Sequence, residues 1–335
     1  MKALVYTGPE QLEIRDVDQP QPGEGEHLVR IEAVGICGSD MHAFLGHDDR
    51  RPAPLTLGHE AAGTITGGPR DGERVTINPL VSCGTCEACQ LGHDNICANR
   101  QIISMPPRQG AFAQFVAMPA SNLVTVPDDI SFDRASLAEP IACGWHAVRL
   151  GLERLGRSPG NMRALVLGGG AIGLGGALSM TAQGVGNVTI SEPNDTRRAF
   201  LNDHCGQNAI APNDLSDVDQ FDIVLDGVGF ALTRATASKH VKPGGVIVHI
   251  GLGEDTGGLD IRRMTLQEIT FIGTYTYTAQ DFRDTAQAIF DGRLGALDWI
   301  DQRALEDGAE AFLDIRAGRT AAPKIVLLPW GNKQS

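Results

Sequence analysis

The sequence predicts an α/β protein of two domains, a mostly-β N-terminal domain followed by a domain built on a doubly wound parallel sheet. Three observations predict it. The chain has 335 residues, which is long for a single ordinary core. Short apolar stretches punctuated by Gly and Pro fill its first part. From residue 131 onward the pattern changes to a helix and then to alternating strands and helices.

The N-terminal part is predicted to form short strands joined by tight turns, because its apolar runs are brief and bounded by Gly- and Pro-rich segments. The predicted strands are residues 2–6, 12–17, 27–35, 73–79 and 111–120. A helix is expected over residues 131–152, where apolar residues follow the helical period and Ser131 with Asp133 can cap the N-terminus.

The second part is predicted to be a βαβ series, which gives a parallel sheet with right-handed crossovers. Its strands are expected at residues 163–168, 187–191, 221–229 and 244–251, with helices at 171–184, 194–206 and 232–244. The C-terminal part looks mixed, with helices expected over 279–294 and 305–318 and a strand over 324–330.

Composition excludes several classes of protein. The formal net charge is −13, with no basic run, so nucleic acid and anionic membranes are not expected partners. The N-terminus lacks the apolar core of a signal peptide, and no window approaches the roughly 18–20 apolar residues that span a bilayer. Seven cysteines, four of them closely clustered, favour metal binding in a reducing compartment over disulfides. A cytoplasmic protein is therefore expected.

Four of these cysteines, Cys83, Cys86, Cys89 and Cys97, stand in a C-x2-C-x2-C-x7-C pattern within residues 80–98. Four thiolates in one short segment match the closed tetrahedral coordination of a structural zinc site. The segment has no apolar period, so a metal is what would fold it. A zinc-ribbon binding module is an alternative, but the acidic charge argues against a nucleic-acid partner.

A dinucleotide fingerprint follows an apolar strand. Gly168, Gly170 and Gly173 form G-x-G-x-x-G, with Ala171 and Ile172 between the last two glycines at the start of a predicted helix. In this motif the first glycine makes the turn, the second admits the pyrophosphate, and the third lets the helix pack closely on the strand. The helix N-terminus then offers free N–H groups to the phosphates.

Glu192 ends the next predicted strand, nineteen residues after Gly173. A carboxylate at this place accepts hydrogen bonds from the adenosine ribose and repels a 2′-phosphate, which predicts NAD. A solvent-facing Glu at a strand end is the alternative. Arg197 and Arg198 could hold the extra phosphate of NADP, but they are expected on the following helix, with one stacked on the adenine side.

A second metal constellation lies upstream. Cys37 offers a thiolate and His59 an imidazole, both of which suit zinc. Adjacent side chains of an extended segment point in opposite directions, so His59 and Glu60 would need a local twist to bind one ion. Glu139 is another carboxylate candidate. We expect Cys37, His59 and either Glu60 or Glu139 as protein ligands, with water at the open position that a catalytic zinc keeps.

These motifs carry a resemblance. CGSDMH at 37–42, GHE at 58–60, the four-cysteine segment, LAEP at 137–140 and the glycine fingerprint follow one another over nearly the full length of the chain. In this order they resemble the zinc-dependent polyol and threonine dehydrogenase branch of the medium-chain dehydrogenase/reductase superfamily. The resemblance implies a GroES-like catalytic domain (residues 1–145), a Rossmann NAD-binding domain (146–275) and a C-terminal segment (276–335) that returns to the catalytic domain.

The resemblance also implies an activity. The expected reaction is hydride transfer from a secondary alcohol or polyol (a sugar alcohol or its phosphate) to NAD+, giving a ketone, with two Zn2+ per chain, one catalytic and one structural. A homotetramer or homodimer is implied. The alternative is a zinc-binding, NAD(P)-dependent sensor or structural relative without turnover.

Further site residues are carried over from the branch by position. Ser39 and His42 are expected to pass the substrate proton through the cofactor ribose to solvent. Asp40 either holds the imidazole of His59 or caps a turn. Where polyol dehydrogenases often have an Arg-Tyr pair, this chain has Thr276 before Tyr277, which disfavours a sorbitol-like substrate.

Overall fold

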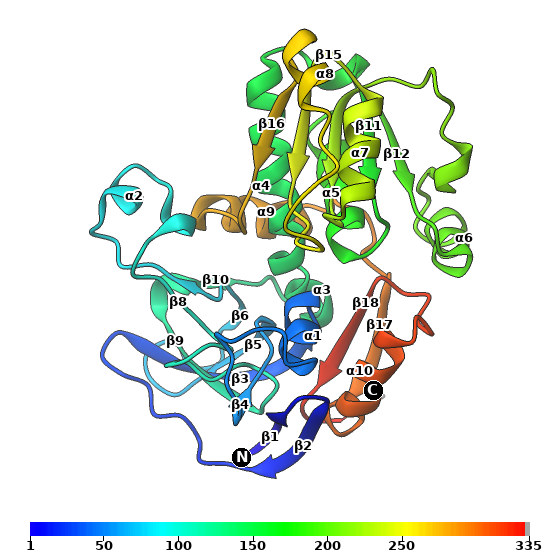
Figure 1. Cartoon of the computed structure of the whole chain (residues 1–335). Coiled ribbons are helices and arrows are strands. Elements are labelled where there is room, and N and C mark those ends of the chain that lie inside the picture. The colour runs from blue at the N-terminus through cyan, green and yellow to red at the C-terminus, as the bar shows by residue number, and fades with distance from the viewer. Residues whose placement is uncertain (332–335) are drawn as a thin grey trace. The chain divides into compact units, whose positions relative to one another are not determined.

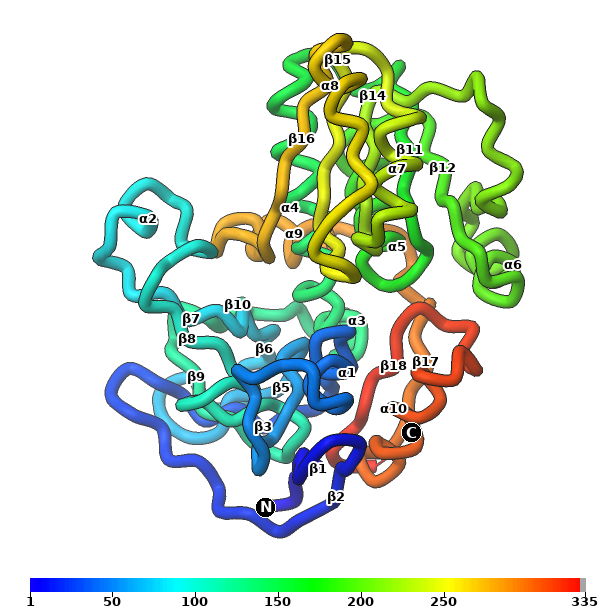
Figure 2. The backbone as a smooth tube through the Cα atoms, viewed as in Figure 1, coloured from blue at the N-terminus to red at the C-terminus, as the bar shows by residue number. Residues whose placement is uncertain are grey.

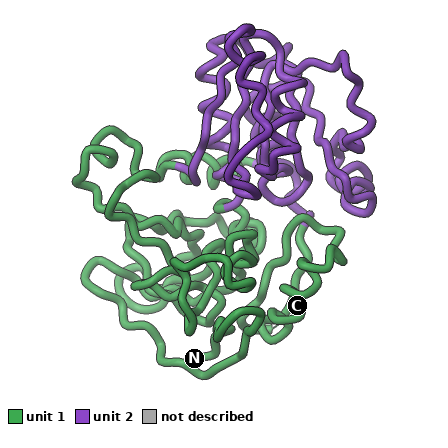
Figure 3. Tube along the Cα trace, viewed as in Figure 1, with its two compact units in different colours: residues 1–139, 278–291, 300–335 green, residues 140–277, 292–299 purple. Residues whose placement is uncertain are grey.

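The computed structural model describes residues 1–331, and the chain divides into two compact units (Figure 3). Unit 1 comprises residues 1–139, 278–291 and 300–335, and unit 2 comprises residues 140–277 and 292–299. The chain thus leaves unit 1 at Glu139, and most of its residues after 277 belong to unit 1 again.

Unit 1 is mostly β, as its short apolar runs bounded by Gly and Pro predict. Its strands are β1 (Lys2–Gly8), β2 (Gln11–Asp16), β3 (Glu26–Gly35), β4 (Leu55–Thr56), β5 (Glu60–Thr66), β6 (Arg74–Ile77), β7 (Leu80–Val81), β8 (Gln101–Ile102), β9 (Phe115–Pro119), β10 (Leu123–Thr125), β17 (Ile300–Ala304) and β18 (Lys324–Leu328). Its helices are α1 (Gly38–Phe44), α2 (Glu87–Gln90), α3 (Phe132–Ser136), α9 (Ala279–Phe290) and α10 (Gly308–Arg316), with short 3-10 turns η1 (Asp94–Ile96), η2 (Ala120–Asn122) and η5 (Leu305–Asp307).

A seven-stranded sheet organises unit 1 around β3. Its strands run in the order β10-β6-β5-β3-β18-β17, and β9 pairs with β3 as well (Figure 1). The C-terminal strand β18 lies antiparallel to β3, and β17 lies parallel beside β18 (Figure 2). Smaller sheets join β2-β1-β4 and β7-β8. The centre of the sheet therefore combines the first and last segments of the chain.

The core of unit 1 is closed by aromatic side chains from both ends of the sequence. Phe312 of α10 packs against Phe44 of α1, with ring centroids 5.2 Å apart, and edge-on against Phe112 at 6.0 Å. All three rings are buried. Such pairs add about 0.5–1.5 kcal/mol each beyond their burial, so the C-terminal segment is a structural part of the unit that carries Cys37 and His59.

Unit 2 is a parallel six-stranded sheet with the order β13-β12-β11-β14-β15-β16. The strands are β11 (Arg163–Leu167), β12 (Asn187–Ser191), β13 (Ala209–Ile210), β14 (Phe221–Asp226), β15 (Val241–His249) and β16 (Thr270–Gly273). The helices are α4 (Ala138–Leu155), which starts in unit 1, α5 (Ala171–Ala182), α6 (Asp195–Asp203), α7 (Ala231–His240) and α8 (Ile261–Leu266), with 3-10 turns η3 (Pro159–Asn161) and η4 (Pro212–Asp214).

The parallel sheet explains the apolar runs of its strands. In β11 and β14, residues 164–167 and 221–226 are buried throughout, as expected for strands covered on both faces. The order reverses on either side of β11, so the carboxyl ends of β11 and β14 form the point at which such sheets bind ligands. The helix expected over residues 131–152 is divided in two, with α3 ending at Ser136 and α4 starting at Ala138.

Candidate active site and metal centres

The four cysteines of the segment 80–98 converge. Their sulfurs all lie within 4.8 Å of one another, with Cys86 and Cys89 3.5 Å apart, Cys97 and Cys83 3.5 Å apart, and Cys83 and Cys89 4.0 Å apart. Four sulfurs at 2.3 Å from one tetrahedral zinc would be separated by about 3.8 Å. The distances therefore suit one Zn2+ between them.

The ionisation of the cluster also favours a cation. Hydrogen bonds from Thr85 lower the pKa of Cys83 to about 5, and the pKa of Cys86 is lowered by its bonds with Cys89. Burial and the neighbouring Cys86 raise the pKa of Cys89 to about 12. Thiols this close cannot all ionise without a compensating positive charge, which a zinc ion supplies.

The four-cysteine segment 80–98, here called the lobe, is anchored to the rest of unit 1 through Asp94. Its carboxylate accepts the backbone N–H of Ala279 at 3.0 and 3.2 Å, at the first residue of α9. A carboxylate at this place satisfies an N–H that the helix itself cannot, and it is stabilised by the helix dipole. Metal binding in the lobe is thereby linked to the start of the segment 278–291.

Three candidate ligands of the second site meet as well. One donor atom each of Cys37, His59 and Glu60 lies within 4.8 Å of the others. Cys37 precedes α1, and Glu60 is the first residue of β5. His59 lies just before the strand, after Gly58 with φ of 88°. The alternation of a strand therefore does not separate His59 from Glu60, and both reach the same place.

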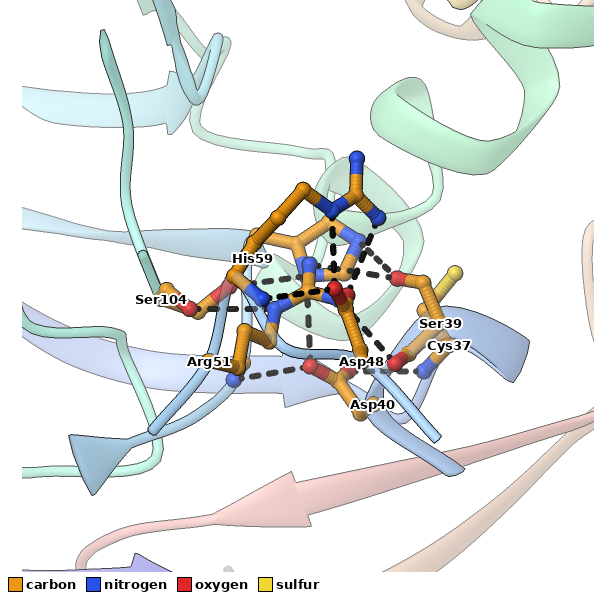
Figure 4. A network of polar contacts seen from close by, with 9 residues as sticks. Cys37, Ser39, Asp40, Asp48, Arg51, His59 and Ser104 are labelled. Atoms are coloured by element: carbon orange, nitrogen blue, oxygen red, sulfur yellow. Dashed lines mark hydrogen bonds and ion pairs between the residues drawn. The ribbon is translucent and has the colours of Figure 1, made fainter. Parts of the chain in front are cut away.

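The imidazole of His59 is held on its Nδ1 side, which leaves Nε2 toward Cys37 and Ser39. Asp40 Oδ1 lies 3.4 Å from Nδ1 and Ser104 Oγ lies 3.5 Å from it (Figure 4). Asp40 also accepts the N–H groups of Cys37 at 3.0 Å and Gly58 at 3.2 Å. The two expected roles of Asp40, imidazole partner and turn cap, are thus combined in one buried carboxylate.

Electrostatics at this imidazole favour a bound positive charge. Burial alone would lower the pKa of His59, but the charges of Asp40 and Cys37 outweigh burial and raise the pKa well above its usual value. Burial would likewise raise the pKa of Asp40, yet His59 and then Arg51 bring it below its usual value. The site attracts a proton where a metal ion would otherwise sit.

Glu60 is packed between a glycine and a buried lysine. Its Oε1 accepts a hydrogen bond from Lys324 Nζ at 2.7 Å, and Lys324 also donates to the carbonyl of Ile36 at 2.9 Å. Glu60 pairs with Gly35 across the sheet, and a Cβ on Gly35 would lie 2.1 Å from Oε2. Buried Oε2 finds no hydrogen-bond partner among residues 1–331. An orphaned carboxylate oxygen beside a thiolate and an imidazole fits a metal ligand.

Lys324 is a site residue that sequence reasoning missed. Burial alone would lower its pKa, but the charges of Glu60, Cys37 and Glu139 raise the pKa above its usual value, so the lysine stays charged. A lysine at the start of the apolar strand KIVLL was the only signal in the sequence. Glu139, buried in the first turn of α4, acts on Lys324 but does not belong to the three-residue group of donor atoms within the described chain.

Ser39 and His42 lie one turn apart on α1. Ser39 Oγ is 3.5 Å from His59 Nε2, and His42 is exposed. Residues three apart on a helix share a face. Arg51, which no sequence motif singled out, is buried beside them and contacts Ser39, Asp48 and Ser104 (Figure 4). No local pattern in the sequence identifies it.

The glycine fingerprint forms the expected turn between β11 and α5. Gly168 adopts φ of 92°, and a Cβ on Gly173 would lie 1.8 Å from the Gly168 carbonyl oxygen. Gly170 is the N-cap of α5, and a Cβ there would meet nothing within 4 Å. Ala171 and Ile172 open the helix, half-buried. This cradle leaves open backbone in front of a helix N-terminus, which is suited to a pyrophosphate.

Glu192 braces this turn from the end of β12. Its Oε2 accepts the N–H of Gly169 at 2.7 Å and Oε1 accepts the N–H of Asn194 at 2.8 Å. Each oxygen keeps a further lone pair for a ligand hydroxyl. Arg198 donates to the carbonyl of Glu192 at 2.8 Å, and Arg197 lies half-buried in the first turn of α6. The side chain of Arg198 is thus engaged in the local loop.

The two residues after the last strand of unit 2 differ in environment. Tyr277 is fully buried, whereas Thr276 is half-buried with φ of 48°. A β-branched residue in the left-handed region is a conformational outlier.

Among the described residues, none of the helices is both long and apolar enough to cross a membrane.

Two family models match the chain. The model described as the alcohol dehydrogenase GroES-like domain matches residues 23–128, and the model described as zinc-binding dehydrogenase matches residues 171–291. These matches confirm the predicted fold class, a GroES-like β domain with a doubly wound α/β domain.

Known proteins are similar over nearly the whole length. L-galactonate-5-dehydrogenase of Escherichia coli (strain K12) is 30% identical, with 88% of this chain and 89% of the relative covered. Sorbitol dehydrogenase of Bacillus subtilis (strain 168) is 27% identical over 98% of this chain and 97% of the relative. A solved alcohol dehydrogenase from E. coli CFT073, complexed with NADH, is 25% identical with a TM-score of 0.88, covering 98% of this chain and 99% of that one. The chain therefore belongs to the zinc-dependent medium-chain alcohol dehydrogenases, in their polyol dehydrogenase branch.

Proposed function

We propose that the protein oxidises a secondary alcohol or polyol to a ketone with NAD+, releasing NADH and a proton. The observation that carries the proposal is the convergence of Cys37, His59 and Glu60, with the buried Oε2 of Glu60 unpartnered within residues 1–331. Thiolate, imidazole and carboxylate are a donor set that zinc accepts, and three protein ligands leave a position for substrate.

In this proposal the metal is held by Cys37 Sγ, His59 Nε2 and Glu60 Oε2. Zn2+ at this place would polarise the substrate hydroxyl and lower its pKa, while NAD+ would accept the hydride. Asp40 orients the imidazole through Nδ1, as outer partners of metal-bound histidines do. Lys324 engages Oε1 and so leaves Oε2 for the metal. Glu139 is then an outer carboxylate that acts through Lys324.

Ser39 and His42 are proposed to remove the proton. Ser39 Oγ lies beside the metal-facing nitrogen of His59 and can accept a proton there while giving up its own. His42 is exposed on the same face of α1 and can exchange a proton with water. The hydroxyl would thus lead the proton outward from the buried end of the site.

The cofactor is proposed to be NAD, bound by the turn of Gly168, Gly170 and Gly173, with Ala171 and Ile172 presenting the helix N-terminus. The two oxygens of Glu192 already accept backbone N–H groups and have lone pairs for ribose hydroxyls. A 2′-phosphate placed there would face this buried carboxylate and be repelled. Arg197 is assigned to the adenine side.

The second Zn2+ is proposed for the four-cysteine lobe, where its role is structural. None of the seven cysteines forms a disulfide within residues 1–331, which supports a reducing compartment such as the cytoplasm. A homodimer or homotetramer is proposed through the edge strand β16. It ends the parallel sheet, and exposed apolar residues lie along it and on α8: Phe271, Ile261 and Leu266. Light scattering on purified protein tests this assembly, and a monomer would contradict it.

The activity is tested by following NADH formation with secondary alcohols, sugar alcohols, their phosphates and sugar acids. Sugar acids are included because one relative is named for galactonate. Turnover is expected with at least one class, to stop when the catalytic zinc is chelated and to return with Zn2+. A zinc-loaded protein that binds NADH yet turns over none of these substrates would instead support a sensor or structural role.

A further inference from the structure

Arg51 is a buried cation, and three of its hydrogen bonds go to Ser39 and Ser104, the two serines beside His59. Its side chain is 2% exposed. Nε donates to the Ser104 carbonyl at 3.0 Å, and one terminal nitrogen donates to the Ser39 carbonyl at 3.1 Å and to Asp48 Oδ2 at 2.8 Å. The other terminal nitrogen lies 3.4 Å from Ser39 Oγ (Figure 4). Burying a guanidinium is costly unless its donors are satisfied in this way.

The two serines that Arg51 holds stand on opposite sides of the imidazole. Ser39 Oγ lies 3.5 Å from His59 Nε2, and Ser104 Oγ lies 3.5 Å from Nδ1. Ser104 is fully buried with φ of 69°, a left-handed conformation that is unfavourable for serine. The bond from Arg51 to its carbonyl stabilises that backbone. One side chain therefore contacts both serines that flank His59, Ser39 through its hydroxyl and carbonyl and Ser104 through its carbonyl.

The chemistry of the Ser39 hydroxyl makes this contact directional. A hydroxyl has one proton to donate and two lone pairs, whereas arginine has donors only. Ser39 can meet Arg51 only as an acceptor, so its own proton must point elsewhere. One lone pair remains for an incoming proton, and the O–H is free to give its proton onward. That is the arrangement a proton relay requires.

We propose that Arg51 is a positioning residue that orients the Ser39 hydroxyl for proton removal from the substrate. The inference rests on the proposed function, in which Ser39 takes that proton as its own passes outward. Among residues 1–331, Arg51 has no hydrogen bond to Cys37, His59 or Glu60, and it acts through Ser39. Because its guanidinium also spans to Ser104, a shorter or non-planar side chain cannot replace it.

Charge around Arg51 supports the same role. Asp48 is shared with Arg50, which donates to both of its oxygens at 2.8 and 2.9 Å. Burial would raise the pKa of Asp48, but Arg50 and then Arg51 lower it below its usual value, so Asp48 carries its charge. The charged Asp48 accepts a hydrogen bond from Arg51 at 2.8 Å, which helps to hold the guanidinium in place beside Ser39.

A double-mutant cycle between Ser39 and Arg51 tests the proposal. Arg51→Gln is expected to lower kcat about tenfold when Ser39 is present, as part of the roughly 10²–10⁴-fold that acid–base groups contribute. In the Ser39→Ala background it should change kcat by less than about twofold, because no hydroxyl remains to be oriented. Ser39→Thr is the matched control, since it keeps a hydroxyl and should keep the tenfold effect.

Two further variants separate orientation from charge and from loop stability. Arg51→Lys keeps the charge but cannot hold both serines, so its kcat should stay within about threefold of Arg51→Gln. Arg50→Gln removes the other arginine of Asp48, whose side chain is 62% exposed, and should leave kcat near wild type. Zinc content and unfolding temperature are measured for every variant, and Arg51→Lys carries the cycle if Arg51→Gln does not fold.

An equal loss of kcat in the Ser39 and Ser39→Ala backgrounds would overturn the proposal, because Arg51 would then act independently of the hydroxyl. Full rescue by Arg51→Lys would also overturn it. A wild-type protein without turnover would refute the proposed function instead. The solvent isotope effect on kcat should rise in Arg51→Gln, since proton removal becomes slower, and should not rise in Arg50→Gln.

Discussion

The two candidate zinc sites of unit 1 are built in opposite ways. The lobe draws four identical ligands from residues 83–97, and their sulfurs surround one point. The second centre draws a thiolate, an imidazole and a carboxylate from Cys37, His59 and Glu60, and it adds the cation of Lys324. A closed set of one ligand type suits a structural ion, whereas a mixed set with a position to spare suits a catalytic one.

The formal charges sharpen the contrast. Four thiolates with one Zn2+ leave the lobe at −2, which disfavours any further electron-rich ligand. The thiolate of Cys37 and the carboxylate of Glu60 neutralise one Zn2+, so the ligand set of the second centre carries no excess negative charge. An alcohol oxygen is therefore attracted to the second centre and excluded from the first. The two centres thus differ in charge as well as in geometry, and both differences suit the lobe to a structural role and the second centre to a catalytic one.

The largest expected effect comes from breaking the second centre, here called the mixed centre, formed by Cys37, His59 and Glu60. Cys37→Ser should lower kcat/KM by more than about a hundredfold, since even outer partners of a metal ligand are worth 10–100-fold. Elemental analysis should find the zinc content falling from two to one per chain. Cys205→Ser, a half-buried cysteine of unit 2 outside both clusters, is the control and should change neither quantity.

Breaking the four-cysteine lobe should have the opposite effect, lowering stability while leaving kcat nearly unchanged. Cys86→Ser should also lose one zinc, but the unfolding temperature should fall by roughly 5 °C or more, because binding free energy at such a site is folding free energy. The chains that remain folded should keep kcat within about twofold, as expected for separate sites. Loss of kcat in proportion to Cys37→Ser would remove the distinction between the two sites.

The carboxylate of the mixed centre can be displaced without removing a ligand. Gly35→Ala places a Cβ 2.1 Å from Glu60 Oε2, so Glu60 must move. We expect the zinc affinity of this centre to fall about 10–100-fold in competition with a chelator, while the lobe keeps its ion. Gly160→Ala, where a Cβ meets nothing within 4 Å, is the matched control. Unchanged affinity in Gly35→Ala would argue for Glu139 as the ligand.

The smallest expected effect concerns pH. The folded pKa of His59 lies above its unfolded value of about 6.5. In the metal-free centre its proton therefore contributes stability that is fully present below about pH 6.5 and is lost as the pH rises through the folded pKa. Zinc must displace that proton, so zinc affinity should fall with decreasing pH.

The measurement is proton release on adding Zn2+ to protein depleted of its catalytic ion, followed with an indicator dye near pH 7.5. Wild type should release about one proton more per zinc than Asp40→Asn, because Asp40 is a principal cause of the raised pKa of His59. Equal release from the two proteins would mean that Asp40 does not control the imidazole.

Local patterns in the sequence predicted most of the fold. Strands β1, β3 and β11 and the turn at Gly168 fall where apolar runs and glycines place them, and the cysteine spacing alone located the lobe. Strand β17 was missed because its sequence, IDQRA, has neither apolar alternation nor β-branched enrichment. It exists through pairing with β18, which no local pattern reports.

The mixed centre was predicted only in part, for the same reason. Motifs gave Cys37 and His59, but the choice between Glu60 and Glu139 depended on how the chain turns at Gly58. Lys324 pairs with Glu60 across 264 residues of sequence. Arg51 has no motif at all, and its position depends on three carbonyl and carboxylate acceptors supplied by the fold. Such polar contacts join residues that are far apart in the sequence, so no hydrophobic period or local motif predicts them.

The position of Lys324 has a consequence for biosynthesis. The ribosome has made all four lobe cysteines by residue 97, so that ion can be captured while the chain is still growing. Lys324 follows Cys97 by 227 residues, so it becomes available to Glu60 only long after the last lobe cysteine has been made. The lobe can therefore capture its ion before the mixed centre has the lysine that pairs with its carboxylate.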